Sequence, residues 1–285
     1  NITETGEVTI SAFAPSSEFY NGSLATEFTF DVIKGDQEIL FEGVTGVTNV
    51  LNMVYDPAGF EFNATAGSGL DVTFEVTSNS DHASFDGNLL TVTAVGQFQI
   101  TMSQPGNENY NAATDVVQTI AIQAAEQTIS FAEVPDKLKT DDPFEITASS
   151  SVGLDLTYTI TQGNNISLND NVVTIDPDAP AGSVTIQISS EGNAVYGPAP
   201  SVSLSFCISP VAPTLTLNND IISSDNMVDQ HEWYKDGEFL QVSDNSNNTF
   251  SPTESGTYTA IAQGGACPSS ALSNEIIYEM VLGLE

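Results

Sequence analysis

The residue types that could carry out catalysis are present, but their spacing matches no known catalytic arrangement. The chain has two histidines, His82 and His231, which are 231 − 82 = 149 residues apart. The sequence contains no Gly-x-Ser-x-Gly nucleophile turn, no His-Glu-x-x-His zinc pair and no glycine-rich phosphate loop. Pairs of carboxylates are frequent, but 38 acidic residues produce such pairs by chance, so they do not indicate a glycosidase. We therefore predict that the chain is not an enzyme.

Clusters of acidic residues provide the oxygen ligands that calcium prefers. The candidate metal ligands are two pairs, Asp141 with Asp142 and Asp176 with Asp178, and a looser group of Asp220, Asp225 and Asn226. The sequence has no EF-hand loop, and Asp and Asn also cap ordinary turns. We expect no required cofactor. Ca²⁺ is the metal that these clusters suggest, and turn capping is the alternative.

The two cysteines, Cys207 and Cys267, are the disulfide candidate of this chain. They are 267 − 207 = 60 residues apart, and a bond would stabilise the segment between them by about 4 kcal/mol through loop entropy. Such a bond indicates an oxidising compartment. The alternative is a pair of unrelated buried thiols.

Aromatic side chains could form a platform for a sugar. Trp233 is the one tryptophan, but its place in a strand pattern predicts a core residue. Tyr20, Tyr110 and Tyr196 recur once in each copy of an internal repeat. We predict that these tyrosines plug a corner of each folding unit, and a binding stripe is the alternative.

The charge balance excludes one class of partner. Against 38 acidic residues the chain has four lysines and arginines together, which gives a net charge of −34. A nucleic acid needs Lys or Arg to neutralise its phosphates, and an anionic membrane surface would repel this chain. We therefore expect no nucleic acid as partner and no membrane insertion, since no apolar run approaches 18 residues. A well-solvated acidic surface is the simplest interpretation.

Strand-forming residues dominate the rest of the sequence. Val, Ile, Phe and Tyr alternate with Thr and Ser, and Gly, Asn, Asp and Pro punctuate them. The nearest approach to a helix, residues 111–126, also has a strand pattern. The sequence therefore predicts an all-β chain. Because Asn1 starts within a strand pattern, we expect the natural start, with any export signal, to lie upstream.

An internal repeat of about 85 to 90 residues organises the chain. The matched segments, with their offsets, are Gly6–Ile10 with Gly96–Ile100 (90), Gln37–Phe41 with Gln127–Phe131 (90), Gly69–Phe74 with Gly153–Tyr158 (84), and Gly106–Tyr110 with Gly192–Tyr196 (86). The offset varies as loop insertions between fixed strands would make it vary. A unit of this length fits one β-sandwich of about seven short strands.

These units resemble the immunoglobulin-like repeats found in tandem in large surface proteins of Bacteroidota. The resemblance lies in the Gln127–Phe131 opening, the Gly153–Tyr158 strand and the Gly192–Tyr196 element, and it extends over about residues 1–208. It implies a cell-surface or secreted location. It says little about function, because such repeats serve adhesins and enzymes alike.

The last segment has a different pattern after the linker Pro210–Pro213. His231–Leu240 looks like an immunoglobulin C strand with its core Trp233, and Glu254–Tyr258 looks like the tyrosine corner that leads into strand F. Ala260 stands where antibody domains have a cysteine, so a Cys207–Cys267 bond would instead tie the opening strand of this module to the region after strand F. The segment resembles modules that precede the sorting domain of the type IX secretion system.

The predicted fold is a set of tandem immunoglobulin-like β-sandwich modules in an extended array. The predicted parts are residues 1–33, the end of a truncated repeat; 34–123 and 124–209, two repeats; 210–279, a terminal module; and 280–285, a linker to a missing domain. We predict an extracellular, non-catalytic structural or adhesive stalk. Its partners would be glycans, other surface proteins, and the upstream and downstream domains of the same polypeptide. Accessory glycan-binding modules of a polysaccharide-degrading enzyme and a subunit of an extracellular fibre are the alternatives.

Overall fold

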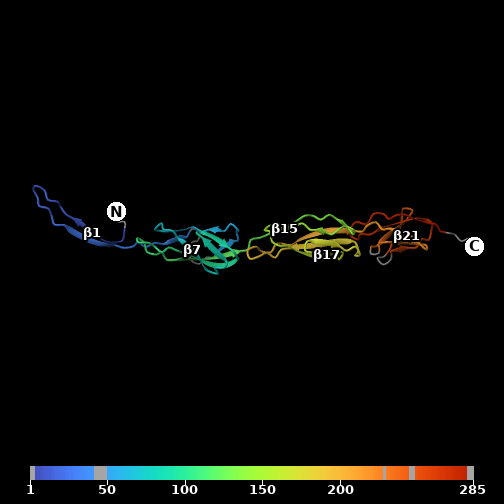
Figure 1. Ribbon diagram of the computed structural model, residues 1–285, viewed down its shortest axis with the longest axis horizontal. Coiled ribbons are helices and arrows are strands. Elements are labelled where there is room, and N and C mark those ends of the chain that lie inside the picture. Colours follow the sequence, from blue (N-terminus) through green and yellow to red (C-terminus); the bar gives the residue numbers. More distant parts are fainter. Residues whose placement is uncertain (1–3, 42–49, 227–228, 244–247, 281–285) are drawn as a thin grey trace, which may run out of the picture. The chain divides into compact units, whose positions relative to one another are not determined.

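The computed structural model describes residues 4–41, 50–226, 229–243 and 248–280. Within these ranges the chain consists of strands and connecting loops, with no helix (Figure 1). The prediction of an all-β chain is confirmed. No helix in these ranges is long and apolar enough to cross a membrane. The predicted linker at 280–285 lies outside the described residues except for Met280.

The chain forms two compact units. The first comprises residues 1–125 together with Asn193–Gly197, and the second comprises Glu126–Gly192 together with Pro198–Glu285. The described residues form three separate hydrophobic cores, one in the first unit and two in the second. The predicted module boundaries stay a prediction.

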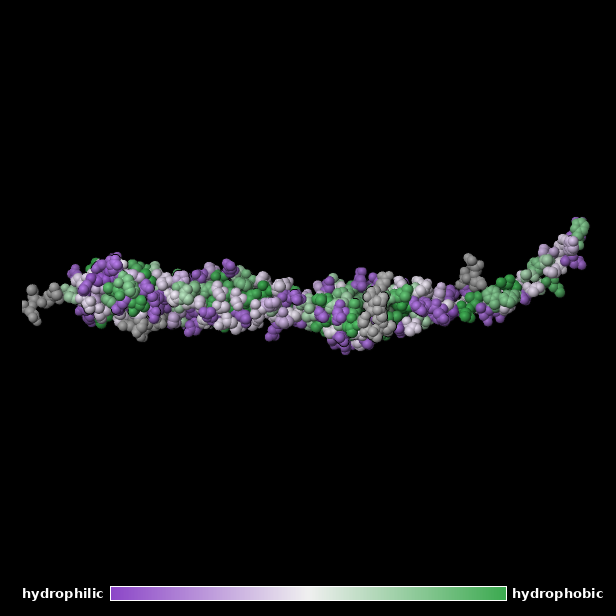
Figure 2. Space-filling view, turned by 180° about the vertical axis from the view of Figure 1, so that it is seen from behind, coloured by the Kyte–Doolittle hydropathy of each residue, from purple (hydrophilic) through white to green (hydrophobic). Residues whose placement is uncertain are grey.

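The first unit begins with the antiparallel hairpin of β1 (Gly6–Ala12) and β2 (Thr26–Val32). Large apolar side chains of this hairpin are exposed: Ile10, Phe13, Phe19, Tyr20, Leu24, Phe28 and Ile33. Figure 2 shows hydrophobic surface along the hairpin, which lies at the right of that view. The repeat explains this exposure, because Ile10 matches Ile100, which is fully buried in the complete sandwich.

A complete sandwich comes next in the first unit. One sheet has the order β4 (Leu51–Val54), β11 (Val116–Gln123), β10 (Gly96–Ser103), β7 (Thr73–Ser78). Opposite it lie two smaller sheets, β3 (Ile39–Phe41) with β6 (Ala64–Ala66), and β5 (Phe60–Glu61) with β9 (Leu89–Val92) and β8 (Ala83–Asp86). Alternation along β10 places Phe98, Ile100 and Met102 in the core.

The second unit repeats this sandwich. Its large sheet has the order β13 (Lys137–Leu138), β20 (Val202–Ser209), β19 (Gly182–Ser189), β16 (Thr157–Gln162). The facing sheets are β12 (Ile129–Phe131) with β15 (Ala148–Ser150), and β14 (Phe144–Glu145) with β18 (Val172–Ile175) and β17 (Ile166–Asn169). The core contains Val184, Ile186 and Ile188 of β19. Matching sheet orders show that the sequence repeat is a structural repeat.

A third sandwich, the terminal module, completes the second unit. One sheet comprises β21 (Leu215–Asn218), β22 (Ile221–Ser224) and β25 (Thr249–Phe250), and the other has the order β24 (Glu238–Val242), β23 (His231–Lys235), β26 (Gly256–Ala262), β27 (Ile276–Tyr278). Trp233 is fully buried, as predicted. Tyr258 donates its hydroxyl hydrogen bond to the Glu254 carbonyl at 2.8 Å, which is the predicted tyrosine corner. Ala260 of β26 is paired with Trp233 on the neighbouring strand β23.

Candidate functional site

The two histidines do not form a site together. His82 belongs to the first unit and His231 to the second. His231 is fully buried, and its Nε2 lies 2.8 Å from the Ser224 hydroxyl. Burial lowers the pKa of His231, and the negative charges of Asp229 and Asp225 act in the opposite direction. The imidazole is therefore a core residue of the terminal module.

The candidate calcium ligands lie in turns. The Asp141 carboxylate accepts a hydrogen bond from the Leu138 backbone N–H at 3.1 Å, and the Asp176 carboxylate accepts one from the Asp178 N–H at 2.9 Å. Asp142 is exposed at the same turn as Asp141. Among the described residues, no group of three or more His, Cys, Asp or Glu side chains is placed to hold a metal ion. The geometry is that of turn capping.

The two cysteines form a disulfide, with 5.5 Å between their Cα atoms. The expectation that Cys207 would lie in the opening strand of the terminal module is wrong. Cys207 lies in β20, which stays paired with β19 up to Ile208, so it belongs to the second sandwich. Cys267 comes after β26 in the terminal module. The bond therefore joins two successive sandwiches covalently.

A buried ion pair lies at the same joint. The Lys139 Nζ is 3.1 Å from the Asp229 Oδ2, and the two side chains are 6% and 1% exposed. Lys139 comes directly after β13 of the second sandwich, whereas Asp229 precedes β23 of the terminal module. A buried pair contributes little net stability compared with apolar packing, but removal of one partner leaves a costly unpaired charge. This pair therefore favours one arrangement of the two sandwiches.

Both oxygens of Asp229 have further partners. Its Oδ1 accepts a hydrogen bond from the Ala181 backbone N–H at 2.7 Å. Its Oδ2 accepts a second bond from the Asn226 Nδ2 at 2.9 Å, and the Asn226 Oδ1 in turn accepts the Asp229 N–H at 3.1 Å. Since a carboxylate with several donors tolerates burial, the Asp229 side chain is held by donors from both sandwiches.

The repeated Gly-Asn-x-x-Tyr element is a rigid turn. The Asn107 Oδ1 accepts the backbone N–H groups of residues 109 and 110 at 2.8 and 2.9 Å. The Asn193 Oδ1 accepts those of residues 195 and 196 at 2.9 and 2.8 Å. Gly106 has φ +76°, and a Cβ there would lie 2.4 Å from the Tyr110 carbonyl oxygen, so glycine is required.

The repeat tyrosines divide into two kinds. Tyr110 and Tyr196 are half-buried and pair through their backbones with Gly35 and Ala125, the opening residues of their repeats. In the first unit the Tyr196 ring also contacts the Tyr55 ring edge-on, with 5.3 Å between centroids. For Tyr20 the prediction of a plugged corner is wrong, since this side chain is 78% exposed on the hairpin.

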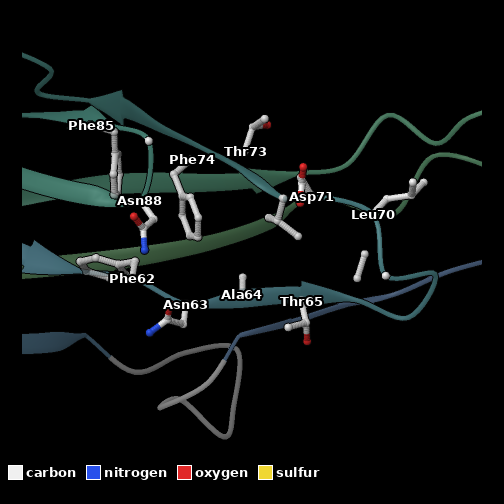
Figure 3. Close-up of a pocket in the computed structure, with 14 residues that line it drawn as sticks. Phe62, Asn63, Ala64, Thr65, Leu70, Asp71, Thr73, Phe74, Phe85 and Asn88 are labelled. Atoms are coloured by element: carbon white, nitrogen blue, oxygen red, sulfur yellow. The ribbon is translucent and has the colours of Figure 1, made fainter.

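A groove in the first sandwich is a candidate place for a small ligand. It encloses about 600 Å³ beside β6 and β7, and Figure 3 shows the rings of Phe74 and Phe85 at one side and Phe62 at another. The polar groups around it include Asn63, Asn88 and Asp71. The Phe74 and Phe85 rings are stacked at 5.3 Å, so they are largely engaged with each other.

The same groove recurs in the second sandwich with about 330 Å³, lined by Asp155, Tyr158 and Asn171. These residues correspond to Asp71, Phe74 and Asn88 in the repeat. Because the groove recurs at the open edge between the sheets, it is a property of the sandwich itself.

Sequence reasoning missed Lys139 and Asp229 as functional residues. Asp229 is one of 38 acidic residues, and nothing in its neighbourhood distinguishes it. Lys139 did carry a signal, because it is one of only four cations in the chain. That signal identifies a lysine of interest but not its partner.

The sheet topology defines the fold class as tandem immunoglobulin-like β-sandwiches. Comparisons with known proteins do not refine this assignment. No family model matches the sequence, and no curated protein does. Among solved structures, Drosophila N-cadherin EC1-4 is 11% identical with a TM-score of 0.24, covering 96% of this chain and 83% of that one. The four N-terminal Ig domains of Dscam1 isoform 7.44 are 9% identical with a TM-score of 0.28, covering 81% and 71%.

A further match is SGBP-B of the Bacteroides ovatus mixed-linkage glucan utilization locus, in complex with a mixed-linkage heptasaccharide. It is 13% identical with a TM-score of 0.24, and the match covers 82% of this chain and 66% of that one. At this level of similarity the matches carry no functional conclusion. The fold class rests on the strand topology of the three sandwiches.

Proposed function

We propose that this chain is a non-catalytic, load-bearing segment of a secreted or cell-surface protein, in which β-sandwiches serve as a stalk. The observation that carries the proposal is the joint between the second sandwich and the terminal module. A disulfide and a buried ion pair fasten the two sandwiches there. A disulfide also fits an oxidising, extracellular compartment.

The strand topology supports a mechanical role. In the first sandwich β4 pairs in parallel with β11, and in the second β13 pairs in parallel with β20. In each pair one strand lies near the start of the sandwich and the other ends it. Since the strands are parallel, tension on the two chain ends shears all their hydrogen bonds together instead of opening them one by one. Such a sandwich resists force.

The biological setting rests on the sequence resemblance alone. We propose a bacterial surface protein of the Bacteroidota type, with further repeats upstream and a type IX sorting domain downstream. The acidic surface fits an extracellular environment and disfavours nucleic acid. Calcium at the acidic turns remains a proposal, to be tested by melting the chain with Ca²⁺ and with a chelator.

Pulling the full chain by its ends tests the mechanical role. We expect each repeat to rupture in a single event, and Met53→Pro to lower the rupture force of the first sandwich because it removes a backbone donor from β4. Thr65→Pro, in the edge strand β6 outside the sheared pair, is the matched control. Equal rupture forces for the two variants would contradict the proposal.

Glycan binding is the second candidate, and the recurring groove favours it. Aromatic rings beside Asn and Asp side chains are a common way of holding a sugar. Binding of the chain to an array of soluble glycans, lost in Asn88→Ala, would support this function. An array without any binding would remove it.

A further inference from the structure

The first and second sandwiches have equivalent positions at one end: in the first unit they contact the element Asn193–Gly197, and in the second unit they contact the terminal module. The Tyr55 N–H donates to the Gln123 carbonyl at 2.8 Å, and the Lys139 N–H donates to the Ser209 carbonyl at 3.1 Å. Gln123 and Ser209 are the last residues of β11 and β20. Tyr55 and Lys139 therefore occupy the same place, directly after the short parallel strand of each repeat.

A backbone donor recurs beside this place. Val95 and Ala181 each precede the glycine that opens the long strand, β10 or β19. The Val95 N–H donates to the Ala194 carbonyl at 3.0 Å, and the Ala181 N–H donates to the Asp229 Oδ1 at 2.7 Å. We name the side chain of Tyr55 or Lys139, with the N–H of Val95 or Ala181, the docking pair of each repeat.

The hairpin shows part of the same arrangement. Thr5 precedes Gly6 as Val95 precedes Gly96, and its hydroxyl donates to the Glu108 carbonyl at 3.0 Å. Glu108 and Ala194 both come directly after the asparagine of a Gly-Asn-x-x-Tyr element. The residue before the strand-opening glycine thus donates to equivalent carbonyls in two cases, at Glu108 and Ala194. In the third case it donates to the Asp229 carboxylate.

The two docking pairs differ in the chemistry that they accept. Tyr55 offers a neutral ring, which contacts the Tyr196 ring, and the neighbouring acceptor is a carbonyl. Lys139 offers a buried ammonium, which needs an anion, and Asp229 binds both the ammonium and the Ala181 N–H. An exchange of partners would leave either the ammonium or the carboxylate buried without a counter-charge.

We infer that the residue after the short parallel strand determines which module can succeed a repeat. Tyrosine there accepts another repeat through its Gly-Asn-x-x-Tyr element, and lysine accepts a terminal module through its buried aspartate. The order of modules is thereby set by one position. This assignment holds whether or not the chain bears load.

Amide hydrogen exchange in the full chain tests the inference, because the Ala181 and Val95 amides report on the two docking pairs separately. We expect Lys139→Tyr to speed exchange at Ala181 by at least about tenfold and to leave Val95 unchanged, since it buries an unpaired carboxylate. Tyr55→Lys should speed exchange at Val95 and leave Ala181 unchanged. The control is Lys137→Tyr, two positions earlier and within β13, and it should change neither amide.

A double variant separates selectivity from simple loss of packing. In Lys139→Tyr/Asp229→Asn the carboxylate charge is gone, but the Asn oxygen can still accept the Ala181 N–H. Exchange at Ala181 should then return to within about threefold of the original rate. Exchange as fast as in Lys139→Tyr alone would overturn the inference, as would a Lys139→Tyr variant that leaves Ala181 protected.

Discussion

Removal of the disulfide should lower the free energy of unfolding of the terminal module by an amount that depends on the length of the loop closed by the bond. Cys207 and Cys267 close a loop with a sequence separation of 60 residues. On the loop-entropy relation the bond raises the free energy of unfolding by about 4 kcal/mol at 25 °C. We therefore expect Cys207→Ser/Cys267→Ser to lose roughly that amount, because the unfolded chain regains the freedom of the loop.

Trp233 provides the assay, since it is the one tryptophan of the chain and lies in the core of the terminal module. Its fluorescence during urea unfolding reports directly on that module. For a slope of about 1–2 kcal/mol per molar urea, the midpoint should fall by roughly 2–4 M. The original chain under reducing conditions should behave as the double variant does.

Cys207→Ser alone is the control, and it should lose as much as the double variant because either serine breaks the bond. A loss below about 1 kcal/mol in both would refute the reasoning. It would mean that packing at the joint already restricts the chain as much as the disulfide does.

Two further predictions concern the turns and the buried imidazole. Gly106→Ala should destabilise the first sandwich by about 1–3 kcal/mol in thermal unfolding, because its Cβ would meet the Tyr110 carbonyl; Gly69→Ala, with φ +77° but no atom within 4 Å, should cost less, and equal losses would count against the steric explanation. His231 has a lowered pKa in the folded chain, so the unfolded chain binds its proton more readily. The contribution of His231 to the free energy of unfolding should therefore be fully present above about pH 6.5. As the pH decreases below this value, the free energy of unfolding should decrease by at most about 1.4 kcal/mol per pH unit. In Trp233 fluorescence His231→Gln should flatten this dependence between about pH 5.5 and 7, and an unchanged slope would show that other groups cause it.

Local patterns were sufficient to predict the strands and the cores. Alternation in Gly96–Ile100 determines which side chains of this strand face inward, and a buried Trp233 is expected from its strand. The tyrosine corner was predictable for the same reason, since Tyr258 bonds to a residue only four positions away.

The joint was not predictable, because its partners are distant in sequence. Lys139 and Asp229 are 229 − 139 = 90 residues apart, and no local pattern connects them. Cys207 was expected in the opening strand of the terminal module although the predicted repeat 124–209 contains it, since sequence alone does not show that β20 continues its ladder with β19 past the cysteine. Tyr20 was misplaced because the repeat predicts a buried corner only where a complete sandwich surrounds it.

The central claim is that the joint couples the terminal module to the second sandwich. Ile186→Ala weakens the core of the second sandwich, where Ile186 is fully buried, by about 2–5 kcal/mol. Its equivalent in the first sandwich, Ile100→Ala, is the matched control. The measurement is the melting temperature of the terminal module, followed by Trp233 fluorescence in the oxidised full chain. The account predicts that Ile186→Ala lowers this temperature and that Ile100→Ala has a smaller effect; an unchanged temperature for Ile186→Ala, or equal shifts for both variants, would contradict it.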